Sequence, residues 1–202
     1  MTTDGADAHK AVEEAARAAR GTVADLAGVP GERLDQALRA IADGLVRRSA
    51  PVLAANEEDM AAAREAGLGG GLLDRLRLDE GRLASIADQL RALAGVPYEP
   101  AERAVRELPS GLLLAERRRP VGVIGANFEA RPNVVVDIAS QFVKSRNAGV
   151  LRTGSAAIRS AITLADDVIA PALDSAGLDP AMIQLVRVPG RPRPGRWSAS
   201  PA

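Results

Sequence analysis

The segment from residue 120 to residue 133 constrains the fold more than any other part of the chain. An apolar run, Val121–Ile124, passes through a polar turn into residues 133–145, which are spaced as a helix. A second apolar run, residues 149–151, follows that helix and ends at Arg152. This order is typical of a strand–helix–strand unit, and such units bind ligands at the carboxyl ends of their parallel strands.

The rest of the chain divides by pattern into three parts. We expect a helical layer, a linker with a hairpin, and a β-α-β-α-β unit, over residues 9–95, 96–119 and 120–189. The last two elements of that unit are a helix at 155–175 and a strand at 182–188. The sequence therefore predicts an α/β fold in which the helical layer and the hairpin precede half of a doubly wound parallel sheet.

The two ends of the chain show no such pattern. Residues 1–8 are polar and acidic, and we expect them to be disordered. Residues 190–202 are dominated by Pro, Gly and Arg without periodicity, which is typical of a disordered tail. A second interpretation is that the original reading frame is lost near Gly190, so that the tail is out of frame.

Composition excludes several classes of function. The 26 basic and 26 acidic residues give a net charge of zero, which does not favour a nucleic-acid partner. We find no apolar stretch of about 18 residues and no secretory leader, so we expect no membrane partner and a cytoplasmic location. The absence of cysteine excludes disulfides and thiolate zinc sites, and we expect no metal site.

Several motifs together resemble one family. The most specific is Gly122–Val134, with Glu-Ala-Arg-Pro-Asn directly after the strand; Ala55–Met60, Leu73–Leu76 and Val143–Thr153 add further matches. On these residues the chain resembles the N-terminal portion of the glutamate-5-semialdehyde dehydrogenases (gamma-glutamyl phosphate reductases) of the aldehyde dehydrogenase superfamily. The resemblance runs from about Lys10 to Gly190.

The resemblance implies an oxidoreductase of proline biosynthesis. Such enzymes use NADPH to reduce gamma-glutamyl phosphate to glutamate-5-semialdehyde, and a cysteine thiolate attacks the acyl phosphate. This chain has no cysteine, so we assign no catalytic residue. We expect residues 9–189 to form a partial NADP-binding domain, truncated or frameshifted, that is inactive alone. The alternative is a non-catalytic interaction module that pairs with a full-length homologue through the hairpin, or with a second copy of itself.

The resemblance also implies which residues contact the cofactor. In the superfamily, the end of the second strand contacts the adenosine ribose and, with NADPH, its 2′-phosphate. That place is taken here by Arg152, Thr153, Gly154 and Ser155. Ser155 is equally well interpreted as a helix cap. Asn133 opens a helix just beyond a strand end, where backbone N–H groups attract anions, and we add it to the cofactor-binding residues.

Two residues in the polar turn are candidate substrate ligands. Arg131 carries a fork of donors that suits a carboxylate or a phosphate, and Glu129 can orient it. The alternative for both is a local turn or cap interaction.

Three residues depart from the family pattern near the nucleotide. Arg146 replaces a glycine directly after the helix expected at 133–145. We expect it to adopt a positive φ at a cost of about 1 kcal/mol. Gly149 replaces a β-branched residue, and we expect it to leave a hole in a buried strand. Thr153 replaces a glycine, which we expect to narrow the approach to a ligand.

Overall fold

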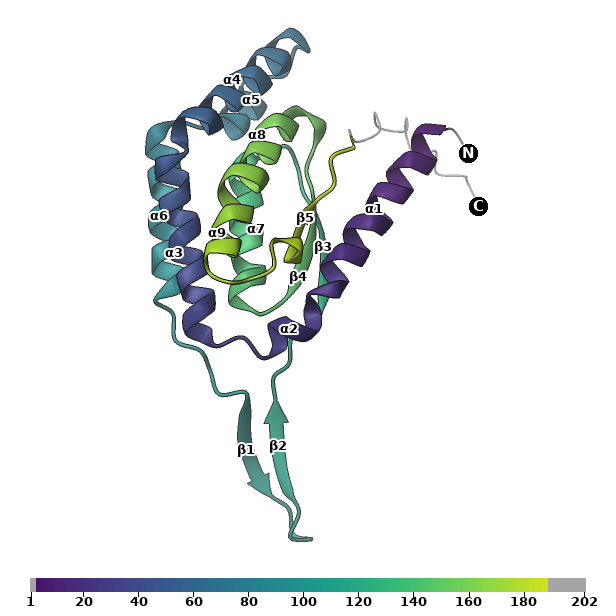
Figure 1. The fold of residues 1–202 in the computed structure, drawn as a ribbon, viewed down its shortest axis with the longest axis vertical. Helices are drawn as coiled ribbons and strands as arrows, with labels where there is room; N and C mark the ends of the chain where they lie inside the picture. Colours follow the sequence, from purple (N-terminus) through teal and green to yellow (C-terminus); the bar gives the residue numbers. More distant parts are fainter. Residues whose placement is uncertain (1–2, 189–202) are drawn as a thin grey trace, which may run out of the picture.

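A computed structural model describes residues 3–188 of the chain. Its centre is a parallel sheet in the order β3-β4-β5, formed by Val123–Asn127, Ala148–Arg152 and Ile183–Leu185. Helix α1 (Thr3–Gly21) covers one face, and α7 (Pro132–Lys144) covers the other (Figure 1). The expected α/β fold with a β-α-β-α-β unit is confirmed.

Two long helices that follow α1 form a further layer outside α7. The long helices α3 (Gly31–Arg47) and α6 (Glu80–Ala94) lie side by side (Figure 1). Between them along the chain are α4 (Ser49–Glu65) and α5 (Gly70–Leu76), and the short α2 (Val23–Ala27) precedes them. The assignment of residues 9–95 to the same domain as the sheet stays a prediction.

One expectation about the N-terminus is wrong. Helix α1 begins at Thr3, so residues 3–8 are helical rather than disordered. Ala15 and Ala19 of α1 are buried, and the helix contacts β4 and β5 through this small-residue face. The predicted tail at 190–202 lies outside the described residues.

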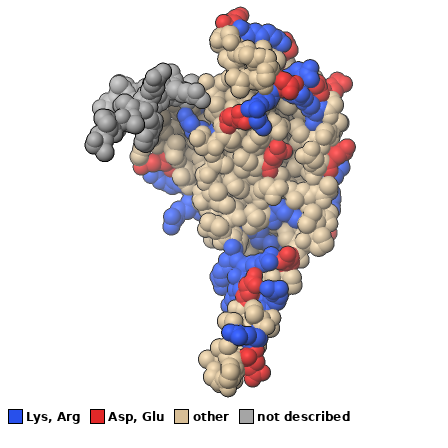
Figure 2. Space-filling model, turned by 180° about the vertical axis from the view of Figure 1, so that it is seen from behind, with Lys and Arg blue, Asp and Glu red and all other residues tan. Residues whose placement is uncertain are grey.

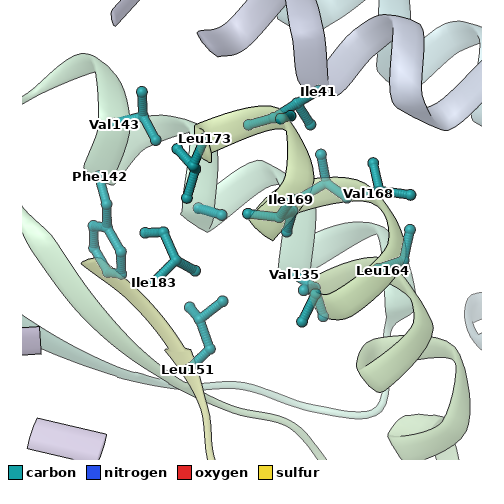
Figure 3. Packing of buried hydrophobic residues seen from close by; sticks show 14 of the residues in the cluster. Ile41, Val135, Phe142, Val143, Leu151, Leu164, Val168, Ile169, Leu173 and Ile183 are labelled. Carbon is teal, nitrogen blue, oxygen red and sulfur yellow. The ribbon is translucent and has the colours of Figure 1, made fainter. Parts of the chain in front are cut away.

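The core is aliphatic because helical apolar stripes meet the sheet. Leu34, Leu38, Ile41 and Leu45 recur along one face of α3 and are fully buried. Residues from the sheet, from α7 and from the helices after β4 complete the core (Figure 3). No helix within residues 3–188 has the length and apolar character that a membrane span requires.

The parallel register places the ends of β3 and β4 beside each other. Val123 pairs with Ala148 and Asn127 pairs with Arg152, so the two strands end at the same level. Strand β4 lies in the middle of the sheet, and all its residues but Arg152 are buried. Val121 precedes β3 and is 81% exposed, so of the apolar run Val121–Ile124 only Val123 and Ile124 belong to the strand.

The hairpin projects away from the body (Figure 1). Strands β1 (Glu102–Glu107) and β2 (Leu113–Arg117) are antiparallel, with an irregularity between Ala104 and Arg106. Leu112, Leu113 and Leu114 are exposed. Basic side chains gather where the hairpin joins the body (Figure 2), and Arg118 and Arg119 line two surface hollows there.

The helix that we expected at 155–175 has four parts. A 3₁₀ turn, η1 (Ser155–Ala157), leads into α8 (Ile158–Thr163), then the π-helical η2 (Leu164–Ile169) and α9 (Ala170–Ser175). A second 3₁₀ turn, η3 (Pro180–Met182), precedes β5. Pro171 lies in the first turn of α9, directly after the π turns, and its missing N–H and its ring do not fit a continuous α-helix.

The structure tests the expectations for two of the three residues that depart from the family pattern. Arg146 has φ 57°, so the expected positive φ is confirmed. The expected hole at Gly149 is wrong, because the ring of Phe142 lies in the space that a Cβ on Gly149 would take.

Candidate functional site

The first part of the site is formed by the paired ends of β3 and β4. Arg152 donates through Nη1 to Oδ1 of Asn127 over 3.0 Å. The backbone N–H of Phe128 donates to the Arg152 carbonyl over 3.0 Å, which extends the ladder by one bond. Because the guanidinium has five N–H donors and this contact uses one, Arg152 retains donors for an anion at the strand ends.

The loop after β4 packs against the turn after β3. Thr153 is buried, and its hydroxyl donates to the Glu129 carbonyl over 3.3 Å. The Thr153 hydroxyl therefore donates its hydrogen bond within the protein. A Cβ on Gly154 would lie 3.0 Å from the Ala130 backbone nitrogen, so a side chain at this position would require the two loops to move slightly apart. Ser155 is exposed at the start of η1.

The interpretation of Ser155 as a helix cap is wrong. Its hydroxyl makes no capping hydrogen bond. The start of α8 is capped from a distant helix, because Asp59 of α4 accepts from the Ser160 backbone N–H over 2.8 Å and from the Ser160 hydroxyl over 2.7 Å. The Asp59 side chain is fully buried. Sequence reasoning missed this role, although Asp59 lies in one of the family-like motifs.

The second part of the site begins at the turn after β3. Nη2 of Arg131 lies 2.6 Å from Oε1 of Glu129, and Nη1 of Arg75 lies 3.4 Å from the other carboxylate oxygen. Glu129 thus orients Arg131, as the sequence indicated it could, and it also binds an arginine from α5. The structure therefore gives both residues the local turn interaction that was the alternative, and leaves their role toward a ligand as a proposal.

Asn133 lies in the first turn of α7, where Pro132 is the first helical residue. Its Nδ2 donates to Oδ2 of Asp137 over 3.1 Å. Burial raises the pKa of Asp137, and the hydrogen bond from Asn133 opposes that rise. The Asn133 side chain therefore faces both its own helix and the cavity described next.

A cavity of about 260 Å³ lies between the α5–α6 connection and the start of α7. We call it the arginine pocket. Its lining residues are Asp74, Arg75, Arg77, Leu78, Arg82, Ser85, Ile86, Arg131 and Asn133. Four cations line it, and only Arg131 and Asn133 among the lining residues were candidates from the sequence. The cluster of arginines around Leu73–Leu76 was the available signal.

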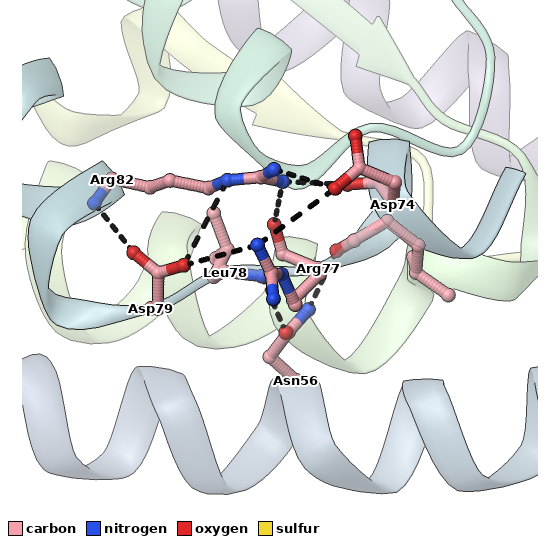
Figure 4. A network of polar contacts seen from close by, with 7 residues as sticks. Asn56, Asp74, Arg77, Leu78, Asp79 and Arg82 are labelled. Atoms are coloured by element: carbon pink, nitrogen blue, oxygen red, sulfur yellow. Dashed lines mark hydrogen bonds and ion pairs between the residues drawn. The ribbon is translucent and has the colours of Figure 1, made fainter. Parts of the chain in front are cut away.

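Carboxylates hold these arginines in place (Figure 4). Nη2 of Arg82 lies 2.7 Å from Oδ1 of Asp74, and Arg77 lies between Asp74 and Asp79 at 3.8 and 3.7 Å. Asp79 also caps α6, because it accepts from the Arg82 backbone N–H over 2.8 Å. Each of the Arg77 and Arg82 guanidinium groups therefore pairs with carboxylates of the protein.

A buried asparagine fixes the backbone beneath this network (Figure 4). Asn56 of α4 donates to the Leu76 carbonyl over 2.9 Å and accepts from the Leu78 N–H over 2.7 Å. It also donates to the Ser160 hydroxyl over 3.1 Å. The same helix thus supports the arginine pocket through Asn56 and the start of α8 through Asp59.

Comparisons with known proteins identify relatives of the chain. No family model matches the chain. The "Gamma-glutamyl phosphate reductase" of Clavibacter michiganensis is 48% identical over 182 residues, which cover 89% of this chain and 42% of the relative. The protein of the same name from Deinococcus radiodurans is 43% identical and is covered to 41%.

Solved structures share the fold. The gamma-glutamyl phosphate reductase of Thermotoga maritima superposes with a TM-score of 0.80 at 29% identity, over 86% of this chain and 42% of that one. A probable aldehyde dehydrogenase from Listeria monocytogenes superposes with a TM-score of 0.69 at 15% identity, over 94% of this chain and 39% of that one. By sequence and by fold, the chain is therefore a homologue of the gamma-glutamyl phosphate reductases, and it spans about 42% of the length of the relatives it matches.

Proposed function

We propose that this chain carries the nucleotide-binding and part of the substrate-binding surface of an NADPH-dependent reductase of gamma-glutamyl phosphate in cytoplasmic proline biosynthesis. The observation that carries the proposal is the pairing of Asn127 and Arg152 at the carboxyl ends of adjacent parallel strands. Ligands of open α/β sheets bind at such strand ends. The names of the relatives supply the substrate and the reaction.

The residues at the strand ends fit a phosphorylated nucleotide. Arg152 is held by Asn127 and has donors left for a 2′-phosphate, which favours NADPH over NADH. Thr153 and Gly154 fix the loop against Glu129 and Ala130, and Ser155 presents an exposed hydroxyl beside it. Asn133 adds the amino end of α7, whose free N–H groups attract anions.

The chemistry itself needs a group that the chain lacks. NADPH supplies a hydride when bound, and the acyl group must first be held as a thioester on a cysteine. The chain contains no cysteine. We therefore assign binding and orientation to Arg152, Glu129 and Arg131, and we propose that the 202-residue chain does not turn over gamma-glutamyl phosphate alone.

Nucleotide binding by the purified chain tests the proposal. We expect NADPH fluorescence to change on titration with the chain, and Arg152→Met to weaken binding by about tenfold or more, because a charge-assisted contact to phosphate is lost. Arg64→Met is the matched control, since Arg64 is an exposed arginine of α4 that pairs with Glu57. Equal affinity of the Arg152 variant and the control for NADPH would contradict the assignment. Turnover by the isolated chain would contradict the proposed inactivity.

A second candidate function rests on the hairpin. A two-stranded hairpin is marginal in water, and β1 and β2 expose Val105, Leu113 and Leu114 as well as their free edges. The chain would then be an interaction module that pairs with a full-length homologue or with a second copy. A complex with a full-length gamma-glutamyl phosphate reductase in size-exclusion chromatography, lost in the Leu113→Glu variant and without added turnover, would favour this function.

A further inference from the structure

We propose that the arginine pocket binds the α-amino-acid end of the acidic substrate, that is, an α-carboxylate together with its α-ammonium group. This inference rests on the proposed function for the identity of the substrate. The inference goes beyond the proposed function because it assigns a site to the end of the substrate that does not react.

The charge around the pocket favours a bound anion. Four guanidinium groups, those of Arg75, Arg77, Arg82 and Arg131, meet three carboxylates, those of Asp74, Asp79 and Glu129. The group therefore carries one positive charge in excess. That excess attracts the α-carboxylate of a ligand.

Arg131 has a donor that its protein partners leave unused. Its Nη2 binds Glu129, but its Nε is buried and has no hydrogen-bond partner among the described residues. A buried donor without a partner costs free energy, and a ligand oxygen removes that cost. The Arg131 side chain lines the pocket, and a carboxylate that reaches this guanidinium can accept from two of its nitrogens.

The pocket also offers a partner for an ammonium group. Asp74 lines the pocket, and its side chain is 65% exposed although Arg82 holds one of its oxygens. The exposed hydroxyl of Ser85 lies in the same lining. A carboxylate and a hydroxyl beside a set of guanidinium groups match the two charges of an amino acid, whereas a phosphate alone has no use for Asp74.

Hydrogen bonds within the protein hold the backbone around the pocket. Asn56 holds the backbone on both sides of Arg77, and Asp79 fixes the start of α6. A site whose side chains are already held loses less entropy when a ligand binds. Glu129 joins the pocket to the nucleotide side, since its carbonyl accepts from Thr153 while its carboxylate binds Arg131. The reacting end of a ligand anchored in the pocket can then extend toward the strand ends.

Isothermal titration of the purified chain with three probes tests the inference. The probes are L-glutamate, glutarate, which lacks the ammonium group, and inorganic phosphate. We expect L-glutamate to bind, glutarate to bind more weakly, and phosphate not to compete with L-glutamate. Arg131→Met should weaken L-glutamate binding by about tenfold or more, and Asp74→Asn should weaken L-glutamate but not glutarate. Arg64→Met is the control.

Other outcomes would overturn the inference. Equal affinities for L-glutamate and glutarate, both unchanged by Asp74→Asn, would contradict the proposal that the pocket binds an ammonium group. Binding of phosphate without binding of L-glutamate would assign the pocket to the other end of the substrate. If Arg131→Met does not fold, Arg131→Lys keeps the charge without the Nε donor, and an unchanged affinity in that variant would contradict the role of Nε. NADPH binding, measured separately, tests the proposed function, so failure of one does not imply failure of the other.

Discussion

The ring of Phe142 in α7 fills the space beside Gly149 in β4 where a side chain would begin. The two residues thus form one packing unit, in which a small strand residue admits a large helix residue. Phe142 is one of two phenylalanines in the chain, so this contact places rare aromatic volume at the centre of an aliphatic core.

Gly149→Ala should destabilise the chain by about 1–3 kcal/mol, because the added methyl group overpacks the site. Phe142→Leu alone should also destabilise it, through lost volume. In the double variant the methyl group enters space that the ring has vacated, so its loss of stability should be smaller than the sum of the single losses. Urea unfolding of all four proteins measures this coupling, and strictly additive losses would show that the two side chains do not compete for one space.

The positive φ of Arg146 should be measurable as strain. Arg146→Gly removes the strain, and Arg146→Ala keeps it, while both lose the hydrogen bond from Nε to the Val29 carbonyl and the contact with the Tyr98 ring. We therefore expect the glycine variant to be more stable than the alanine variant by about 1 kcal/mol. Chemical denaturation compares them. Equal free energies of unfolding would mean that the turn does not need a left-handed residue.

Tyr98 should ionise at unusually high pH. Burial raises its pKa, and the hydrogen bond that its hydroxyl donates to Asp35 raises it further. Tyr98 is the only tyrosine of the chain, so the ultraviolet absorbance of tyrosinate reports on this residue alone. We expect the absorbance of the folded chain to change well above the ordinary pKa of 10.0, and that of the urea-unfolded chain to change near it.

The same shift has a consequence for stability. Because the pKa is raised in the folded state, the stabilisation is fully present below the unfolded value of 10.0 and is lost as pH rises through the folded value. Tyr98→Phe removes this alkaline loss. A Phe variant whose stability declines above pH 10.0 as steeply as that of the original chain would contradict the assignment.

Asp137 should lower stability at neutral pH. Burial raises its pKa, so the protonated form is favoured in the folded state, and that contribution is present at acidic pH and lost as pH rises through the folded value. Asp137→Asn keeps an acceptor for Asn133 and stays neutral at every pH. We expect this variant to be more stable than the original chain at neutral pH, with a difference that shrinks on acidification. Asp88→Asn, at an exposed site on α6, serves as the surface control, and a similar gain there would remove the explanation by burial.

The sequence predicted the framework because its signals are local. The apolar spacing of Leu34, Leu38, Ile41 and Leu45 specified the buried face of α3, and the run that ends at Arg152 specified a strand end. The positive φ of Arg146 followed from the resemblance, because the family has a glycine at this place after the helix.

The sequence did not predict contacts between distant segments. Asp59 caps α8 across 101 residues of chain, and Asn56 supports a turn 20 residues away. Phe142 fills the space at Gly149 only because a helix crosses a strand there. The arginine pocket has the same origin, since α5, α6 and α7 each contribute part of its lining. Such features depend on packing, which no local pattern encodes.

The π turns of η2 have a counterpart in residue spacing. Ala157, Ala161, Ala165, Ile169 and Leu173 recur every fourth residue, and all are buried. In a regular α-helix this spacing would rotate away from the core by about 160° over the run. The segment from Leu164 to Ile169 thus holds one amino acid more than an unbroken helix would need. Deleting one residue from η2 would keep the same face of the helix toward the core. It would also place Pro171 inside a continuous α-helix, where its ring clashes with a backbone carbonyl. The surplus amino acid and the proline are therefore tolerated only together.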